Sequence, residues 1–210
     1  MKKYLSLGVT CMAIAACFLA VAKEEKEQKR VGDPYTLNTC LVSGEKLGSM
    51  GDVPVLLHEG REIRLCCGGC EKKFNDNAEA MLQEIDKKLI KDQDAHYPTN
   101  TCINSGAELK EGGVAFIVGN RLFKTCCDNC KAKVQADPAA FMAKLDAQVA
   151  EAQKAAYKLD ACPISGEPLG DEPVEIVVAN RLVKLCCAGC KKGVDKDPAA
   201  LIEKIDMAAK

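Results

Sequence analysis

Cysteine recurs along this chain in three groups of four, at a period of about sixty residues. In every group a single cysteine is followed, after a stretch of ordinary sequence, by the segment Cys-Cys-x-x-Cys. The groups are Cys40, Cys66, Cys67 and Cys70; Cys102, Cys126, Cys127 and Cys130; and Cys162, Cys186, Cys187 and Cys190. This recurrence predicts three tandem modules, over residues 38–97, 98–158 and 159–210, each built around its own cysteines.

Each module is expected to contain a β-hairpin. Two short apolar runs flank a two-residue turn in every repeat, at residues 53–57 and 63–65, 114–118 and 122–123, and 174–178 and 182–185. The turns are Glu59-Gly60, Gly119-Asn120 and Ala179-Asn180. Gly and Asn tolerate the positive φ that a tight hairpin turn requires, so the pattern favours paired strands.

A longer helix is expected after the last cysteine of each group. Asp137-Pro138 and Asp197-Pro198 place a capping carboxylate before a proline suited to the first helical position, and Asn77 takes the capping position in the first repeat. Apolar residues then follow a helical stripe: Met81, Leu82, Ile85 and Leu89; Phe141, Met142, Leu145 and Val149; and Leu201, Ile202 and Ile205. We interpret these helices as spacers, and the predicted fold is a small α+β chain of three tandem ββα modules.

The order of a thiol, a hairpin and further thiols at a helix start is typical of zinc-knuckle and treble-clef modules. The N-terminus of a helix lowers the pKa of nearby thiols, and thiolate is the form that binds metal. Four thiolates suit a tetrahedral Zn²⁺ site, and a small module with only 4% aromatic residues gains stability from a bound ion. All twelve grouped cysteines are therefore candidate metal ligands, for Zn²⁺ or alternatively for Cu⁺ or another thiophilic ion.

The pattern also resembles the TRASH and YHS group of heavy-metal-binding domains. The third repeat carries it most fully, with Cys162-Pro163-Ile164-Ser165-Gly166, Cys186-Cys187-Ala188-Gly189-Cys190 and Asp197-Pro198, and Phe74 matches the family's aromatic residue in the first repeat. The resemblance implies a non-enzymatic role in heavy-metal trafficking, storage or resistance. This chain departs from the family in having serine at the second knuckle position, Ser43, Ser105 or Ser165, and an extra cysteine at Cys67, Cys127 or Cys187.

Two other roles for the cysteines stay open. Four cysteines per module could form a disulfide framework without metal, since an exported protein meets an oxidising compartment. Alternatively, Cys67-x-x-Cys70 and its copies have the spacing of a thioredoxin-like redox motif, although the βαβ context of that motif is missing.

The first residues predict export. Lys2 and Lys3 precede an apolar stretch that ends in Ala20-Val21-Ala22, so residues 1–22 are expected to be a signal peptide and the protein to be periplasmic or secreted. Ile14-Ala15-Ala16-Cys17 resembles a lipobox, so the alternatives are a lipoprotein anchored through Cys17 or a retained anchor. Residues 23–37 are charged and are expected to form a disordered linker.

Composition and the remaining polar residues narrow the function further. With 29 Lys and Arg against 30 Asp and Glu, the chain lacks the basic footprint of a nucleic-acid-binding protein, and metal ions with an unidentified envelope protein are the expected partners. No catalytic triad, phosphate-binding loop or paired-carboxylate site stands out.

His58 and His96 do not recur between repeats, so we do not expect them to be ligands. Arg61, Arg121 and Arg181 do recur, as do the basic residues Arg64, Lys124 and Lys184, and we place them on solvated strand faces rather than beside thiolates.

The modular interpretation makes a prediction for Cys190→Ser. If each cysteine group stabilises its own module, this change should expose the third repeat to proteolysis and leave the first two protected. Limited proteolysis followed by mass spectrometry measures the effect. Equal loss of protection along the whole chain would contradict it.

Overall fold

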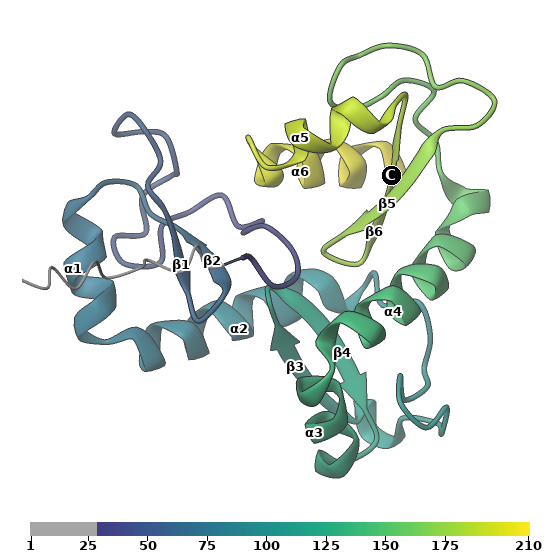
Figure 1. Ribbon diagram of the computed structural model, residues 1–210, viewed down its shortest axis with the longest axis horizontal. Helices are drawn as coiled ribbons and strands as arrows, with labels where there is room; N and C mark the ends of the chain where they lie inside the picture. Colours follow the sequence, from purple (N-terminus) through teal and green to yellow (C-terminus); the bar gives the residue numbers. More distant parts are fainter. Residues whose placement is uncertain (1–28) are drawn as a thin grey trace, which may run out of the picture.

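The computed structural model describes residues 29–210, which form three hairpin-and-helix units in succession, each with a cysteine cluster (Figure 1). The first unit contains β1 (Val55–His58), β2 (Arg61–Arg64), α1 (Gly69–Asp76) and α2 (Ala78–Asp94). The second contains the 3-10 helix η1 (Lys110–Gly112), β3 (Val114–Val118), β4 (Arg121–Thr125), α3 (Asp128–Ala136), α4 (Pro138–Gln153) and η2 (Lys154–Ala156). The third contains β5 (Val174–Val178), β6 (Arg181–Leu185), η3 (Ala188–Cys190), α5 (Lys191–Val194) and α6 (Pro198–Ala209).

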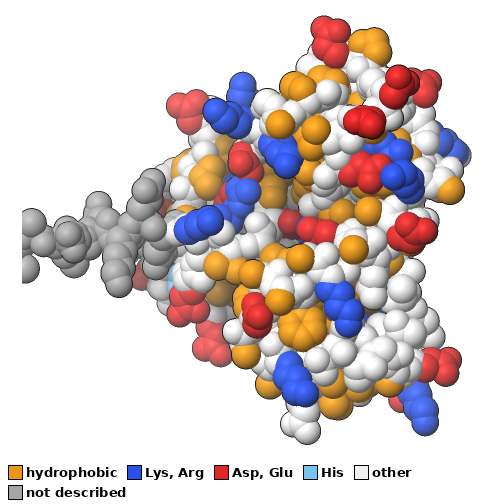
Figure 2. Space-filling model, turned by 45° about the vertical axis from the view of Figure 1, so that its right-hand side comes forward, with side chains coloured by type: hydrophobic (Ala, Val, Ile, Leu, Met, Phe, Trp, Pro, Cys, Tyr) orange, Lys and Arg blue, Asp and Glu red, His pale blue; other side chains and the backbone are white. Residues whose placement is uncertain are grey.

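The predicted tandem arrangement of small mixed units is confirmed. The predicted signal peptide and the lipobox cysteine lie outside the described residues. Within residues 29–210, no helix combines the length and the apolar character needed to cross a bilayer. On the face seen in Figure 2, acidic and basic side chains are interspersed, with apolar side chains between them.

The hairpins close through the turns that the sequence predicts. Both turn residues have positive φ in every hairpin: Glu59 and Gly60 at 52° and 81°, Gly119 and Asn120 at 51° and 64°, and Ala179 and Asn180 at 48° and 60°. This is the backbone of a type I′ turn, whose twist matches that of the paired strands. The strands of each hairpin are antiparallel, and in the second hairpin Phe116 stands opposite Phe123 with their rings stacked at 6.1 Å.

The helix caps and stripes also follow the prediction. Asp137 accepts a hydrogen bond from the backbone N–H of Ala140 at 3.2 Å, and Asp197 caps α6 in the same way at 3.0 Å. Asn77 occupies the N-cap position of α2 without a side-chain capping bond. The innermost residues of the stripes, such as Ile85 and Leu145, are buried in separate cores, one in each unit.

The long helices α2 and α4 are more than spacers, because the end of each docks on the next hairpin. Gln93 in α2 is fully buried; its side chain donates to the carbonyl of Asn120 at 2.8 Å and accepts from the N–H of Leu122 at 2.9 Å. Gln153, at the end of α4, makes the same two bonds to the third hairpin at 2.9 and 2.8 Å. Each long helix therefore sets the position of the unit that follows it.

Residues 30–35, here called the N-terminal strap, bond to all three hairpin turns. The N–H of Val31 donates to Gly60 at 2.8 Å, and the N–H of Asp33 donates to Gly119 at 2.7 Å. The N–H of Ala179 donates to the Asp33 carboxylate at 2.6 Å. The turns thus meet at the middle of the molecule (Figure 1).

The disorder predicted up to residue 37 is wrong for the strap, because Asp33 and Tyr35 are buried. The strap fits between the turns because Gly32 and Gly119 lie in close backbone contact. A Cβ on Gly32 would overlap the carbonyl oxygen of Gly119, and a Cβ on Gly119 would overlap the carbonyl oxygen of Val31. Close backbone approach of this kind requires glycine. The charges of this segment favour disorder, whereas Gly32 permits its close packing between the turns.

Two of the three arginines that follow the hairpin turns are buried and the third, Arg61, is partly buried, which corrects the prediction of a solvated strand face. Arg121 and Arg181 are each 2% exposed. Each arginine pairs with an aspartate of the long helix of its own unit: Arg61 with Asp86 at 2.7 Å, Arg121 with Asp146 at 2.7 Å, and Arg181 with Asp206 at 2.9 Å. Arg121 also donates from Nη2 to Oδ1 of Asp33 at 2.8 Å, which joins the strap to the second unit. The charge of a buried guanidinium requires such partners.

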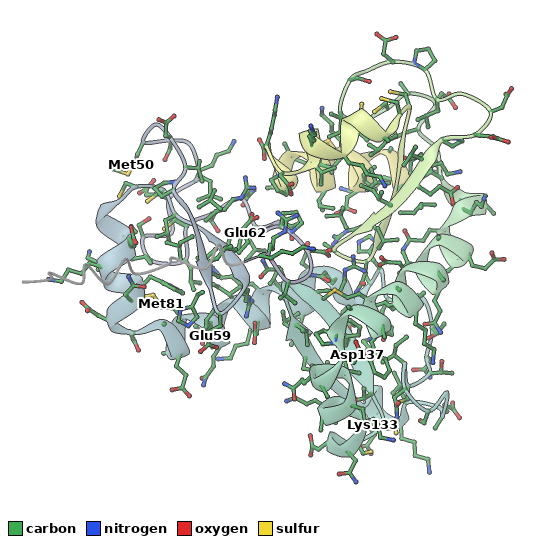
Figure 3. The ribbon with its side chains drawn as sticks, in the orientation of Figure 1. Met50, Glu59, Glu62, Met81, Lys133 and Asp137 are labelled. Atoms are coloured by element: carbon green, nitrogen blue, oxygen red, sulfur yellow. The ribbon has the colours of Figure 1, made fainter. Side chains whose placement is uncertain are left out.

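The first and third units are joined through Glu62, which lies on the inward side of the first hairpin (Figure 3). Its carboxylate accepts from Nη1 of Arg30 at 2.8 Å and from Nε of Arg64 at 2.8 Å. Arg64 in turn donates to the carbonyl of Lys196 at 3.0 Å, and Arg30 pairs with Asp195 at 2.7 Å. Burial opposes ionisation of Glu62, but these hydrogen bonds outweigh it and lower its pKa.

We predict that Asp33→Asn lowers the free energy of unfolding by about 3 kcal/mol, because an amide NH₂ would face a buried guanidinium that needs a carboxylate. Denaturant unfolding of the reduced protein measures the loss. Asp195→Asn removes a half-exposed partner of Arg30 and is the matched control, with an expected loss of under about 1 kcal/mol. Equal losses for the two variants would show that the buried pair contributes no more than the surface pair.

Candidate metal centres

Each cysteine cluster lies at the end of a hairpin opposite its turn. The first cysteine sits in a tight knuckle: the N–H of Cys40 donates to the carbonyl of Glu45 at 2.7 Å, and the N–H of Gly44 donates back to Cys40 at 2.8 Å. Gly44 has a φ of 77°, a conformation that favours glycine. The same pair of bonds and the same positive-φ glycine recur at Cys102 and at Cys162.

The other cysteines come from the hairpin and from the helix after it. The vicinal pair follows the second strand directly in the second and third repeats and after one residue, Leu65, in the first, so strand pairing sets its position. The last cysteine of each group lies in the first helical turn: Cys70 in α1, Cys130 in α3 and Cys190 at the end of η3. The knuckle, the strand end and the helix start therefore each contribute one thiol to a common point.

Three thiols in each repeat converge into a triad. The triads are Cys40, Cys66 and Cys70; Cys102, Cys126 and Cys130; and Cys162, Cys186 and Cys190, and within each the Sγ atoms all lie within 4.8 Å of one another. The Sγ atoms of Cys66 and Cys70 are 3.6 Å apart, and the equivalent distances in the other repeats are 3.7 and 3.6 Å. Sulfurs bound to one ion at about 2.3 Å lie about 3.8 to 4.0 Å from each other, so the triads fit a thiophilic ion.

The same distances bear on the disulfide alternative. All twelve cysteines of the described residues are free, and their closest sulfurs are far beyond the bonding distance of about 2.05 Å. As the chain is folded here, each cluster presents thiols to a common centre.

A serine hydroxyl adjoins each triad. Ser43 Oγ lies 3.1 Å from Cys66 Sγ, and the equivalent distances for Ser105 and Ser165 are 3.5 and 3.3 Å. These serines were expected only to be departures from the family pattern, yet each lies beside a triad sulfur. Their recurrence in all three repeats was the signal that they belong to the cluster.

Hydrogen bonding lowers the pKa of the knuckle thiols and so favours thiolate, the form that binds metal. Burial raises the pKa of Cys40, but hydrogen bonds from the Ser43 hydroxyl and from nearby backbone N–H groups outweigh it and lower the pKa to about 7. The same balance lowers the pKa of Cys102 to about 6 and that of Cys162 to about 6.

Two of the helix-start thiols differ in this respect. Burial, with hydrogen bonding to Cys66, raises the pKa of Cys70 to about 12, and hydrogen bonding to Cys186, with burial, raises the pKa of Cys190 to about 12. Without a cation, the first and third triads thus favour a thiolate at the knuckle and a protonated thiol at the helix start. A bound ion would displace that proton, so metal uptake should release protons.

The fourth cysteine of each group, Cys67, Cys127 or Cys187, lies outside the triad. The backbone at Cys127 is extended, with φ −164° and ψ 167°, and Cys187 is similar at −157° and 165°. In these two repeats the chain turns into the helix only after the fourth cysteine. The role of these three cysteines as ligands stays a prediction.

The basic residues and the histidines belong to other contacts. Lys124 pairs with Asp94 at 2.6 Å, and Arg64 pairs with Glu62, so neither is engaged with a thiol. His58 packs edge-on against Phe74, with ring centroids 5.5 Å apart, and His96 Nε2 lies 3.6 Å from an oxygen of Asp206. Neither histidine belongs to a triad.

A tyrosine precedes each knuckle by five residues, a recurrence that was not among the predicted site features. The hydroxyls of Tyr97 and Tyr157 each accept a hydrogen bond at 3.1 Å from the N–H of a lysine in the second strand, Lys124 and Lys184. Tyr35, the first copy, instead donates to the carbonyl of Thr39 at 3.1 Å. In the second and third repeats the tyrosine therefore ties the chain entering the knuckle to the strand that carries the vicinal thiols.

Comparisons with protein-family models, with curated proteins and with solved structures found no match to this chain. The resemblance of the cysteine pattern to TRASH and YHS domains therefore stays a prediction.

We predict that Ser105→Ala raises the pKa of Cys102 from about 6 toward the ordinary value of 9.0, because it removes a hydrogen bond that favours the thiolate. Thiolate absorbance in the reduced, metal-free protein should then develop at higher pH. A thiol whose pKa is lowered by folding stabilises the protein fully above pH 9.0, and this contribution is lost as the pH falls through about 6. The variant should therefore lose part of the rise in stability across that window.

Ser49→Ala is the control for this experiment. The Ser49 hydroxyl is exposed and donates to the carbonyl of Lys46 at 2.7 Å, away from any thiol. Its removal should leave the titration unchanged. An unchanged titration in Ser105→Ala as well would show that the hydroxyl does not set the pKa of Cys102.

Proposed function

We propose that this protein binds thiophilic metal ions, one in each cysteine triad, and carries out no catalysis. The observation that supports this function is the threefold recurrence of three thiols within 4.8 Å of one another. Three chain segments must be brought together to form each triad, and the fold does so in the same way in every repeat. A packing role alone does not require three sulfurs to converge.

The donor set restricts the choice of ion. Three sulfurs and a neighbouring hydroxyl suit soft or borderline ions, and exclude Ca²⁺ and Mg²⁺, which prefer oxygen ligands. Zn²⁺ would take the three thiolates and a fourth ligand, from the serine hydroxyl, solvent or the fourth cysteine. Cu⁺ is the alternative, because it accepts fewer ligands and favours thiolate.

The setting of the sites supports handling of metal rather than catalysis. Each triad lies at the far end of a hairpin whose turn is held at the centre, so the clusters occupy separate outer ends of the molecule. We propose trafficking, storage or resistance as the broader role, in the periplasm or outside the cell, with anchoring through Cys17 as the alternative. The TRASH and YHS resemblance and the predicted signal peptide support this role. The partners would be the metal ions and an envelope protein that receives them.

We predict that the reduced protein, dialysed against excess Zn²⁺ or Cu⁺ and then against buffer, retains about three ions per chain, one for each triad. Elemental analysis with a protein assay measures the ratio. Cys126→Ser should reduce it to about two, since two sulfurs remain in that triad. Absence of metal from the reduced protein, with the twelve cysteines of protein isolated without reductant present as six disulfides by mass, would support the disulfide framework instead.

A further inference from the structure

We propose that Cys67, Cys127 and Cys187 are exchange thiols, which bond to the metal ion while it enters or leaves the adjacent triad and do not belong to the resting ligand set. This inference rests on the proposed metal-binding function and adds to it a route for transfer. It assigns a role to the one thiol of each group that the triad leaves out.

The first support is the position of the fourth sulfur at the edge of each triad. Cys67 Sγ lies 3.9 Å from Cys66 Sγ and 3.8 Å from Cys70 Sγ. In the second repeat Cys127 Sγ lies 3.8 Å from Cys126 Sγ, and in the third Cys187 Sγ lies 3.8 Å from Cys190 Sγ. The fourth thiol thus touches triad thiols in every repeat, but it is not within 4.8 Å of all three.

The second support is the backbone. Cys127 and Cys187 are extended, and the chain turns into the helix only after them, so their thiols lie beside the triad sulfurs at the rim of the site. Because the fourth sulfur is not within 4.8 Å of all three triad sulfurs, it would bond to an ion at the triad centre in place of one of them.

Exposure separates the fourth thiols from the knuckle thiols, and in the second repeat the triad thiol of Cys126 is exposed as well. The knuckle cysteines Cys102 and Cys162 are each 1% exposed, whereas Cys127 and Cys187 are exposed to solvent. An acceptor protein approaching these clusters would meet the fourth thiol before the knuckle thiol. Free cysteine is among the most buried residue types, so an exposed free thiol in the same place in successive repeats calls for a chemical role.

The exchange is a ligand substitution without oxidation or reduction. A bond forms between the ion and the fourth sulfur, whose proton passes to solvent, while the bond from the ion to one triad sulfur breaks and that thiolate takes up a proton. The ion keeps its charge and its number of thiolate ligands throughout. A ligand of the acceptor can then replace the next triad sulfur in the same way.

The three repeats differ in how far their thiols are exposed to solvent. In the first repeat all three triad cysteines are buried and Cys67 is only partly exposed, whereas the fourth thiols of the other two repeats are exposed. Transfer should therefore be slower from the first repeat. In the wild-type protein, release should resolve into a fast phase of about two ions and a slow phase of about one.

The test uses the full chain loaded under reducing, anaerobic conditions with Zn²⁺ or Cu⁺, whichever ion the stoichiometry measurement finds in the triads. A chromogenic chelator in excess reports the rate of transfer, and equilibrium competition with the same chelator reports affinity. The variant combines Cys67→Ser, Cys127→Ser and Cys187→Ser. The matched control makes the same change one residue earlier, combining Cys66→Ser, Cys126→Ser and Cys186→Ser.

We expect the first variant to keep about three ions per chain and its affinity within about threefold, while transfer slows at least tenfold. The control variant should lose its ions. Cys187→Ser alone, at an exposed position, provides the same comparison for one site if the combined variant does not fold.

Three outcomes would overturn the inference. Loss of the ions from the first variant would make the fourth cysteines resting ligands and leave the proposed function intact. Unchanged transfer kinetics would remove the exchange role and also leave that function intact. Failure of the wild-type protein to bind either ion would overturn both.

Discussion

The paired charges of Asp33 and Arg121 hold the centre of this molecule together. Arg121 is 2% exposed, and its guanidinium would be costly to bury without carboxylate partners. Asp33 supplies one, while its backbone and its second oxygen bond to the turns of the second and third hairpins. Each unit has only a small apolar core, so contacts at the turns add the stability that three small cores lack separately. The strap and the ends of α2 and α4 complete these connections.

Holding the turns at the centre has a direct consequence for the cysteines. A hairpin has two ends, and when the turn is buried among the other units, the strand ends that carry the vicinal thiols must lie outward. The three triads are thereby separated and each faces its own surroundings. The glycine of each knuckle, such as Gly44 with its φ of 77°, then folds the first thiol back toward the strand end. The same architecture that stabilises the fold therefore presents the candidate sites for exchange with a partner.

Many residues of the candidate sites were predictable because the same cysteine spacing recurs in three repeats. The recurring spacing marks the thiols that form the triads, and the hairpin turns and the caps at Asp137 and Asp197 depend on residues close together in the chain. The serine contribution was not predicted, because Ser43 was compared with a family pattern instead of being placed next to Cys66. The exclusion of the fourth cysteine from the triad was also missed, since it depends on where the extended chain ends and the helix begins, a difference of one or two residues.

The sequence by itself determined the local features: the three cysteine groups, the type I′ turns and the apolar stripes, since each depends on spacing, on positive φ or on helical periodicity. The tertiary structure alone decided that Arg121 and Arg181 are buried and that residues 30–35 of the predicted linker form a strap. Asp33 and Arg121 are 88 positions apart, and no periodic pattern links them. Charge pairing of this kind arises only when separate segments meet in space, because a single charged residue has the same local sequence signal whether it faces solvent or a buried partner.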